Sequence, residues 1–175
     1  MASLHFKKEF VEKNDKRNRN IDQHMADLPV ALESAILERV RFGRSENTSF
    51  WVQGTRLSEL CEHLKKRCEI DWLENLSCAQ VDQNLLLTYF LRSSITHETV
   101  ILRVSLELPD EHQSFVEMGS VESTWESART FEEEILMLFG VRFSGGTNEF
   151  HPSESMWDGF PLRKDFIINA SEGLT

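Results

Sequence analysis

Three consecutive glutamates, 132–134, are the first candidates for acid–base chemistry in this chain. General acid–base catalysis by carboxylates requires two of them in one cleft with separated pKa values. Successive residues of a helix point about 100° apart, so neighbours in this run do not face each other. The run is better explained as the acidic opening of a helix, where the helix dipole favours carboxylates. We therefore expect no catalytic residue here.

Cysteines and histidines are the candidates for metal or cofactor binding. The three cysteines, Cys61, Cys68 and Cys78, do not match the spacing of a zinc or iron–sulfur motif. No two of the six histidines stand four residues apart, the spacing at which a helix can hold a metal. The sequence also lacks a glycine-rich phosphate loop and a Gly-x-Ser-x-Gly elbow. We expect no metal or cofactor bound by this chain, and buried, reduced thiols at Cys61 and Cys68.

Charge and hydropathy restrict the class of partner. The net charge is −10, although residues 1–20 carry six lysines and arginines. Such an acidic body repels phosphate backbones, so we expect no nucleic-acid partner. No run approaches the roughly 18 apolar residues of a membrane span, and the N terminus resembles neither a secretory signal nor a transit peptide. We expect a bacterial cytoplasmic protein that reaches a membrane only through partners.

Hydrophobic periodicity predicts the elements that position these residues. Apolar side chains at helical spacing predict helices over 30–41, over 57–68 with Thr55 as the cap, and over roughly 124–139. Alternation or continuous apolar character predicts strands within 48–54, 85–92 and 99–108, the last two as a hairpin. No element is predicted for the stretch "IDWLENLSCAQVDQ" or for the connector up to Ser120.

These elements predict an α+β fold. The expected architecture is a mixed, largely antiparallel sheet packed with two helices, followed by a third helix and an extended C-terminal arm. Its expected organisation is a polar, basic N-terminal arm (1–28), an α+β core domain (29–140) and an extended C-terminal docking arm (141–175).

The stretch "WDGFPLRKDF", residues 157–166, is the strongest binding motif. Gly159 frees the backbone and Pro161 fixes its own φ, so the segment is expected to be an extended, stiffened arm. Extended geometry places Phe160, Leu162, Lys164 and Phe166 on one face, and turns the fork of Arg163 toward a carboxylate on the other. Two interpretations remain open: the arm docks on a neighbouring protein, or it folds back on its own core with Trp157 as anchor.

Together, "GSVESTWESARTFEEEILMLFGVRF" and "WDGFPLRKDF" resemble signatures of the thirty-kilodalton subunit family of respiratory complex I, which also occurs in energy-converting membrane-bound hydrogenases. The resemblance covers roughly residues 50–166 and implies a subunit interface. The residues carried over to that interface are Glu132, Glu134, Phe139, Gly140, Trp157, Gly159, Pro161, Leu162, Arg163, Lys164, Asp165 and Phe166.

The sequence departs from the family pattern at three places. Glu133 stands where the family has Arg, and Met137 stands where it has Asp. The stretch "GTNEFHPSE" replaces the usual "HPDLRRIL", so an arginine pair that should dock neighbouring subunits is missing. These differences suggest a divergent complex or a different way of binding neighbours.

The resemblance implies a cofactor-free assembly subunit in the peripheral arm of a proton-translocating NADH:quinone oxidoreductase, without an active site of its own. It would hold the quinone-site and iron–sulfur subunits together, while NADH, FMN, iron–sulfur clusters and quinone are bound by those partners. The expected location is the cytoplasmic face of the bacterial inner membrane. Two alternatives stay open: the equivalent subunit of a membrane-bound [NiFe] hydrogenase or formate hydrogenlyase, and a free-standing enzyme with an unrecognised site.

Overall fold

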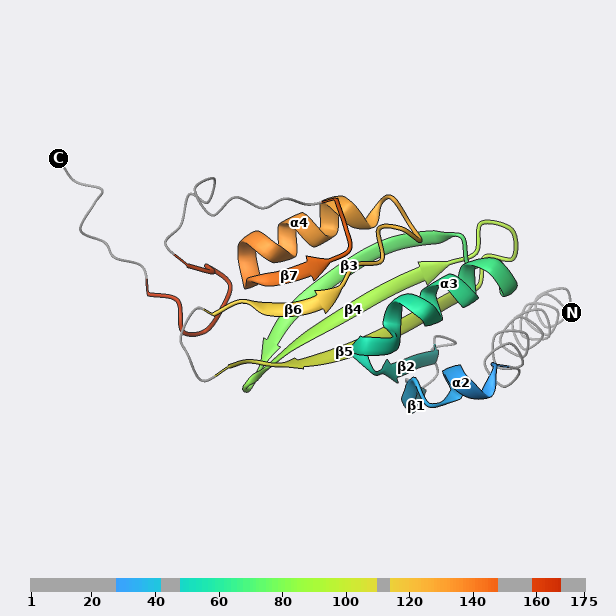
Figure 1. Cartoon of the computed structure of the whole chain (residues 1–175), viewed down its shortest axis with the longest axis horizontal. Coiled ribbons are helices and arrows are strands. Elements are labelled where there is room, and N and C mark those ends of the chain that lie inside the picture. Colours follow the sequence, from blue (N-terminus) through green and yellow to red (C-terminus); the bar gives the residue numbers. More distant parts are fainter. Residues whose placement is uncertain (1–27, 42–47, 110–113, 148–158, 168–175) are drawn as a thin grey trace, which may run out of the picture.

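A computed structural model describes residues 28–41, 48–109, 114–147 and 159–167 (Figure 1). Most of the expected N-terminal arm therefore lies outside the described residues. In chain order the elements are α2 (Val30–Glu33), β1 (Ile36–Arg41), β2 (Thr48–Val52), η1 (Gly54–Arg56), α3 (Leu57–Arg67), β3 (Trp72–Val81), β4 (Asn84–Arg92), β5 (Thr99–Glu107), β6 (Val116–Gly119), α4 (Ala128–Phe139) and β7 (Val141–Ser144).

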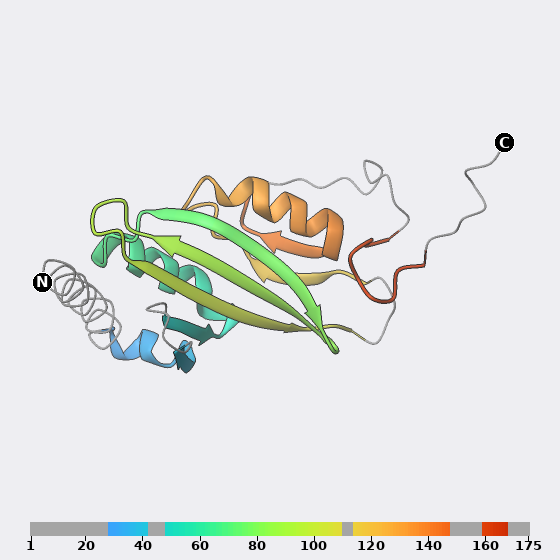
Figure 2. The ribbon, with the colours of Figure 1, turned by 180° about the vertical axis from the view of Figure 1, so that it is seen from behind.

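Five strands form the main sheet in the order β1-β2-β5-β4-β3. Every neighbouring pair is antiparallel except β2 and β5, which run parallel. Helix α3 crosses one face of this sheet, and no described helix lies over the opposite face of β3, β4 and β5 (Figure 2). The predicted α+β fold with a mixed, largely antiparallel sheet is confirmed.

The hydrophobic core lies between the sheet and the two long helices. The odd-numbered residues of β4 from Leu85 to Leu91 point inward and are fully buried, as a half-buried strand requires. They meet the apolar stripe of α3, formed by Leu57, Leu60, Cys61 and Leu64. Each such buried leucine contributes about 1.5–3 kcal/mol. This packing holds α3 and α4 on the same sheet face, because both helices contribute to one core cluster.

A second, two-stranded sheet joins the chain on either side of α4. Strands β6 and β7 are parallel, and Val141 and Phe143 of β7 are buried in the main core. Figures 1 and 2 both show β6 between β7 and the end of β5. Residues 141–144, which the sequence analysis assigns to the C-terminal arm, are therefore part of this sheet.

The helix predicted over 30–41 is wrong. Only one turn, α2, is helical, and residues 36–41 form β1 against β2. The backbone N–H of Gln53 bonds to the carbonyl of Ala35, so strand pairing begins just before β1. Tertiary pairing here overrides the helical spacing of the apolar residues, because a sheet edge offers a full set of backbone partners.

Two further details of the prediction are corrected. Thr55 does not cap α3, because it lies inside the 3-10 turn η1 and the helix begins at Leu57 without a side-chain cap. The glutamate run does not open α4, which begins at Ala128, so Glu132 already lies in the second turn. Strands β3, β6 and β7 were not predicted.

Candidate functional site

The C-terminal segment 159–167 folds onto the end of α4 (Figure 1). It is not extended, because the N–H of Arg163 bonds to the carbonyl of Phe160 and the N–H of Phe166 bonds to that of Arg163. The segment thus consists of two consecutive turns, with Pro161 at the second position of the first, where its fixed φ fits. The turns break the expected alternation: Phe160 is buried, whereas Leu162 is 53% exposed.

Two hydrogen bonds attach this segment to the last carbonyls of α4. The N–H of Leu162 donates to the carbonyl of Leu138 at 3.1 Å, and Nε of Arg163 donates to the carbonyl of Phe139 at 2.7 Å. The final carbonyls of a helix have no partner within the helix, so they need donors from elsewhere. A third bond, from the N–H of Lys164 to Oε1 of Gln80 at 2.8 Å, ties the segment to β3. The segment therefore completes the end of α4.

Gly140 provides the space for this attachment. It ends α4 in the left-handed conformation, with φ of +68°, which glycine adopts without the steric cost of a Cβ. A Cβ at this position would lie 2.4 Å from the ring of Phe160. Phe160 itself is only 6% exposed. The glycine is therefore required both for the helix end and for the close approach of the ring.

One guanidinium and one aromatic ring contact Phe160. The guanidinium of Arg163 lies 4.5 Å from the Phe160 ring centroid, and Phe115 meets the same ring edge to face at 5.0 Å. The guanidinium of Arg142 lies 4.3 Å from the ring centroid of Phe115. Such cation–π and edge contacts each contribute about 0.5–1.5 kcal/mol. We call the contacts of Gly140, Phe160 and Arg163 the C-terminal clasp.

Arg163 is buried in its own chain, with 5% of its surface exposed. Burial lowers the pKa of Arg163, and the nearby Asp165 opposes that shift. Its Nη2 has no hydrogen-bond partner within the described part of the chain. Residues 159–167 fold back on the core of their own chain, which is one of the two arrangements compatible with the sequence. Trp157, the expected anchor, lies outside the described residues.

Glu132 is a second buried anchor, with 1% of its surface exposed. One oxygen accepts from Oγ of Ser120 at 2.7 Å and the other accepts from the N–H of Val121 at 2.9 Å. Desolvation raises the pKa of Glu132, although both hydrogen bonds favour the carboxylate. The side chain thus holds the loop before α4 against the helix. Glu134 is exposed, so the glutamates of the run diverge as expected.

Two of the remaining interface candidates, Leu162 and Lys164, are exposed beside the clasp, whereas the candidates Gly159, Pro161, Asp165 and Phe166 are half-buried. Two further residues, Met137 and Ile167, were not among the candidates but are exposed and apolar. Leu162, Ile167 and Met137 are exposed by 53%, 78% and 45%, and Lys164 is also exposed. Leu162 is held next to the last turn of α4, which carries Met137. We call Met137, Leu162, Lys164 and Ile167 the docking surface. Contact of this surface with a neighbouring subunit stays a prediction.

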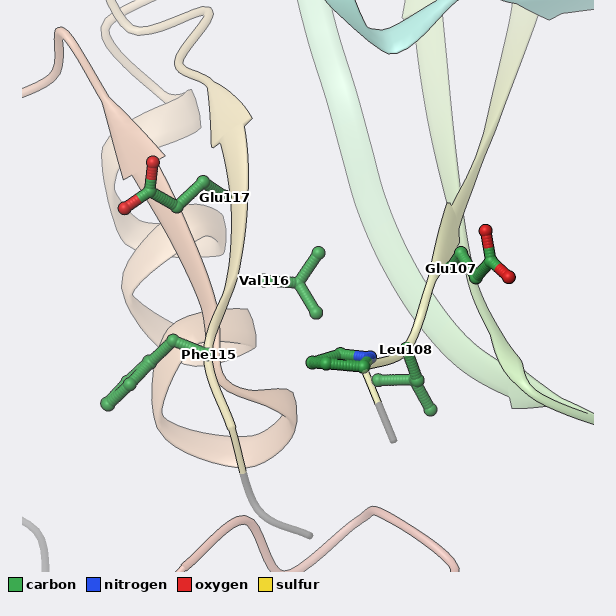
Figure 3. A pocket seen from close by; sticks show the side chains of 6 residues that line it. Glu107, Leu108, Phe115, Val116 and Glu117 are labelled. Atoms are coloured by element: carbon green, nitrogen blue, oxygen red, sulfur yellow. The ribbon is translucent and has the colours of Figure 1, made fainter. Parts of the chain in front are cut away.

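A groove of about 430 Å³ lies between the end of β5 and the start of β6 (Figure 3). Figure 3 shows Val116 directed toward Leu108 across the groove, while the carboxylates of Glu107 and Glu117 point away to either side. Pro109 and Phe115 complete its lining. The groove combines aliphatic walls with acidic flanks.

Metal-binding residue groups and membrane-spanning helices are two features that the described ranges can reveal. No group of three or more His, Cys, Asp or Glu residues there could hold a metal ion. The three cysteines are free, and Cys61 and Cys68 are buried as expected. Among the helices that the structure describes, none is both long and apolar enough to cross a bilayer.

Three residues around the clasp were not predicted from the sequence: Gln80, Phe115 and Arg142. Gln80 comes from β3 and Phe115 directly precedes β6, so both are distant in sequence from the end of α4, whereas Arg142 lies in β7, directly after α4. No local pattern marks them. Proline favours the second position of a turn, so Pro161 could have predicted the turn that begins at Phe160.

Most of the chain matches a known protein family. Residues 50–172 match the family described as respiratory-chain NADH dehydrogenase, 30 kDa subunit. The match begins within β2 and includes β3, β4 and β5 of the main sheet, both long helices and the C-terminal segment.

Individual relatives and a solved structure are also similar. The C-type subunit of the NADH-quinone oxidoreductase of Roseiflexus sp. (strain RS-1) is 29% identical, with 83% of each chain covered. The C/D-type subunit of the Acidiphilium cryptum (strain JF-5) enzyme is 32% identical over 49% of this chain, and the match spans 14% of that protein. A chain in the structure of the membrane-bound sulfane sulfur reductase, an archaeal respiratory membrane complex, has the same fold, with a TM-score of 0.67 at 18% identity, covering 86% of this chain and 85% of that one. The chain therefore belongs to the 30 kDa subunit family of respiratory-chain NADH dehydrogenases.

Proposed function

We propose that this chain is a cofactor-free assembly subunit in the peripheral arm of a proton-translocating NADH:quinone oxidoreductase. In this proposal it holds the quinone-site subunit and iron–sulfur subunits together at the cytoplasmic face of a bacterial inner membrane. The electrons pass through those partners, which bind NADH, FMN, iron–sulfur clusters and quinone.

The observation that supports this proposal is the division of the family motif into two sets. Glu132, Gly140 and Arg163 are buried and act within the chain, where they fix the loop before α4 and the segment after it. Leu162 and Lys164 flank the buried Arg163 and face outward. A rigid backbone that presents exposed apolar side chains loses little conformational entropy on binding, which is the property expected of a docking element.

Apolar exposure on this surface also supports docking. Met137, Leu162 and Ile167 are among the large hydrophobic side chains most exposed in the described residues. Aliphatic side chains gathered beside one cation suit a partner surface that is apolar with a carboxylate at its rim. Lys164 would pair with that carboxylate.

A second candidate is the equivalent subunit of a membrane-bound [NiFe] hydrogenase or formate hydrogenlyase. The observation that favours it is the stretch "GTNEFHPSE", which lacks the arginine pair of the usual family sequence. A different neighbour surface would explain the loss of two positive charges.

Affinity purification of the tagged chain from its native membranes tests both candidates. Recovery with an NADH-binding flavoprotein, iron–sulfur subunits and a quinone-site subunit supports the first. Recovery with a nickel–iron subunit and no flavoprotein supports the second. A chain recovered alone, at a yield that excludes loss of partners during washing, would contradict an assembly role.

A further inference from the structure

The free edge of β6 beside the groove is the strongest unassigned feature. Strand β6 pairs with β7 in a two-stranded parallel sheet, and no strand of the described ranges pairs with its other edge. Two strands alone are marginally stable, and purely parallel pairs are usually buried within larger sheets. The arrangement is that of a sheet with a vacant strand position.

Backbone geometry shows which groups face that position. The N–H of Val116 bonds to Gly140 and the N–H of Ser120 bonds to Ser144, so even-numbered residues of β6 direct their backbone groups toward β7. In a strand, alternate residues direct N–H and C=O to opposite edges. The N–H and C=O of Glu117 therefore point to the free edge.

Side chains of an added strand would alternate between two environments. A residue beside Val116 would enter the groove, where it would meet the aliphatic side chains of Val116 and Leu108 and the ring of Pro109. A residue beside Glu117 would lie on the outer face, next to a carboxylate that is 73% exposed and lies 3.8 Å from Nη1 of Arg142. Cross-strand pairs of opposite charge are stabilising, and like charges are not. The body of the chain is acidic, which adds to the preference for a cation.

We propose that the free edge of β6 binds an extended segment of a neighbouring subunit as a third strand, with an apolar side chain in the groove and a lysine or arginine opposite Glu117. This inference rests on the proposed function, because it takes the occupant from the same complex. Strand addition to an exposed edge is a common recognition mode, in which backbone bonds supply affinity and side-chain pockets supply specificity.

Amide hydrogen exchange in the isolated full-length chain and in the complex purified from membranes tests this proposal. In the isolated chain, the amide of Glu117 should exchange much faster than that of Met118, which faces β7. In the complex, exchange at Glu117 should slow by about tenfold or more, while Met118 changes little. Equal exchange at Glu117 in both samples would overturn the proposal, and an intact complex in that sample would leave the proposed assembly role standing.

Variants at the same position provide a second readout. Glu117→Pro removes both the N–H that faces the free edge and the carboxylate, and keeps the pairing with β7, as proline can at a strand edge. It should leave the melting temperature of the isolated chain nearly unchanged and weaken retention in the complex by about tenfold. Glu117→Gln keeps the N–H and should weaken retention less, in a salt-dependent way. Glu126→Gln, at another exposed carboxylate, is the matched charge control.

Other occupants give distinct results, each of which contradicts the proposal. If the amide of Glu117 is protected in the isolated chain and loses that protection when residues 1–27 are removed, the occupant of the free edge is a segment of this chain. Protection that increases with the concentration of the isolated chain would identify a second copy. Unchanged retention of Glu117→Pro in the complex would exclude strand addition at this edge.

Discussion

Nε of Arg163 donates a 2.7 Å hydrogen bond to the carbonyl oxygen of Phe139, the last residue of α4. A side chain 24 residues away in sequence thus completes the end of the helix. The same guanidinium stacks on Phe160, which occupies the space above Gly140. Arg163 therefore fixes the direction of the C-terminal segment and leaves Leu162 and Lys164 facing outward.

Replacing Arg163 should destabilise the isolated chain. Arg163→Ala removes a buried hydrogen bond and the packing of the guanidinium on Phe160, at a cost of about 1–3 kcal/mol in the free energy of unfolding. Lys164→Ala is the matched control, because its side chain is exposed and its backbone bond to Gln80 remains. Urea unfolding of both variants measures the difference. Equal free energies of unfolding for Arg163→Ala and wild type would contradict the role of the clasp.

Gly140 and Phe160 should show coupled substitution effects. Gly140→Ala costs about 1–2 kcal/mol for the left-handed backbone, plus the clash with the Phe160 ring. Gly145→Ala is a matched control, because its φ is +83° but no atom lies within 4 Å of an added Cβ, so it carries only the backbone cost. In a Phe160→Ala background, the cost of Gly140→Ala should fall to that of Gly145→Ala. Additive effects of the two substitutions would show that the ring and the glycine do not interact.

Glu132 should make stability depend on pH. Desolvation raises its folded-state pKa above the ordinary value of 4.5, so the folded chain binds more protons than the unfolded chain between these two values. The free energy of unfolding contributed by this group is therefore highest below 4.5 and falls as pH rises through the folded-state pKa. Glu132 interacts electrostatically with three other ionisable groups, Cys61, Tyr89 and Glu122.

Glu132→Gln cannot titrate but can still form hydrogen bonds with Ser120 and Val121. Its free energy of unfolding relative to wild type should therefore increase as pH rises from 4.5 through the folded-state pKa of Glu132. Glu132→Ala leaves both donors without a partner and should cost about 2–4 kcal/mol. Thermal melts from about pH 4 to about pH 8 measure both differences. Parallel curves for wild type and Glu132→Gln would rule out titration of this carboxyl.

The cysteines should react slowly with thiol reagents in the folded chain. Burial raises the pKa of Cys78 to about 12 and raises that of Cys61 still further. Only the thiolate is a nucleophile, so little reactive form exists at neutral pH. A colorimetric thiol assay should detect slow reaction of all three cysteines in buffer and rapid reaction in denaturant. Rapid labelling of Cys61 in the native chain would contradict its position in the core.

Local patterns predicted the elements whose apolar residues repeat regularly. Strands β4 and β5 and helix α3 carry continuous periodic runs, and each was found close to its observed bounds. Strand β3 was missed because its exposed residues mix polar side chains with Trp72 and Val81, and a bulge between Leu73 and Asn75 interrupts the alternation. Strands β6 and β7 are defined by pairing across α4, and β1 by pairing with the next strand, β2; periodicity within one segment reveals neither.

The candidate site was predictable only in part. Resemblance to the family identified Glu132, Gly140 and Arg163, but residue type alone suggested that the Arg163 fork faces a partner. Its acceptor is the backbone carbonyl of Phe139. Every residue carries such a carbonyl, so the side-chain types in the sequence do not identify which one accepts the bond. Which motif residues are buried and which remain exposed therefore required the structure.

The central claim is that the clasp presents the docking surface to neighbouring subunits, and Leu162→Asp tests it most directly. Leu162 is 53% exposed, so the substitution should leave the melting temperature of the isolated chain nearly unchanged. Ile95→Asp, at a 70% exposed residue of the β4–β5 loop, is the matched control.

The decisive measurement is the recovery of the assembled complex from membranes that express each tagged variant. We expect wild type and Ile95→Asp to recover the complex equally, and Leu162→Asp to reduce recovery by about tenfold or more, because a buried interfacial carboxylate costs several kcal/mol. Full recovery of the complex with Leu162→Asp would contradict the account.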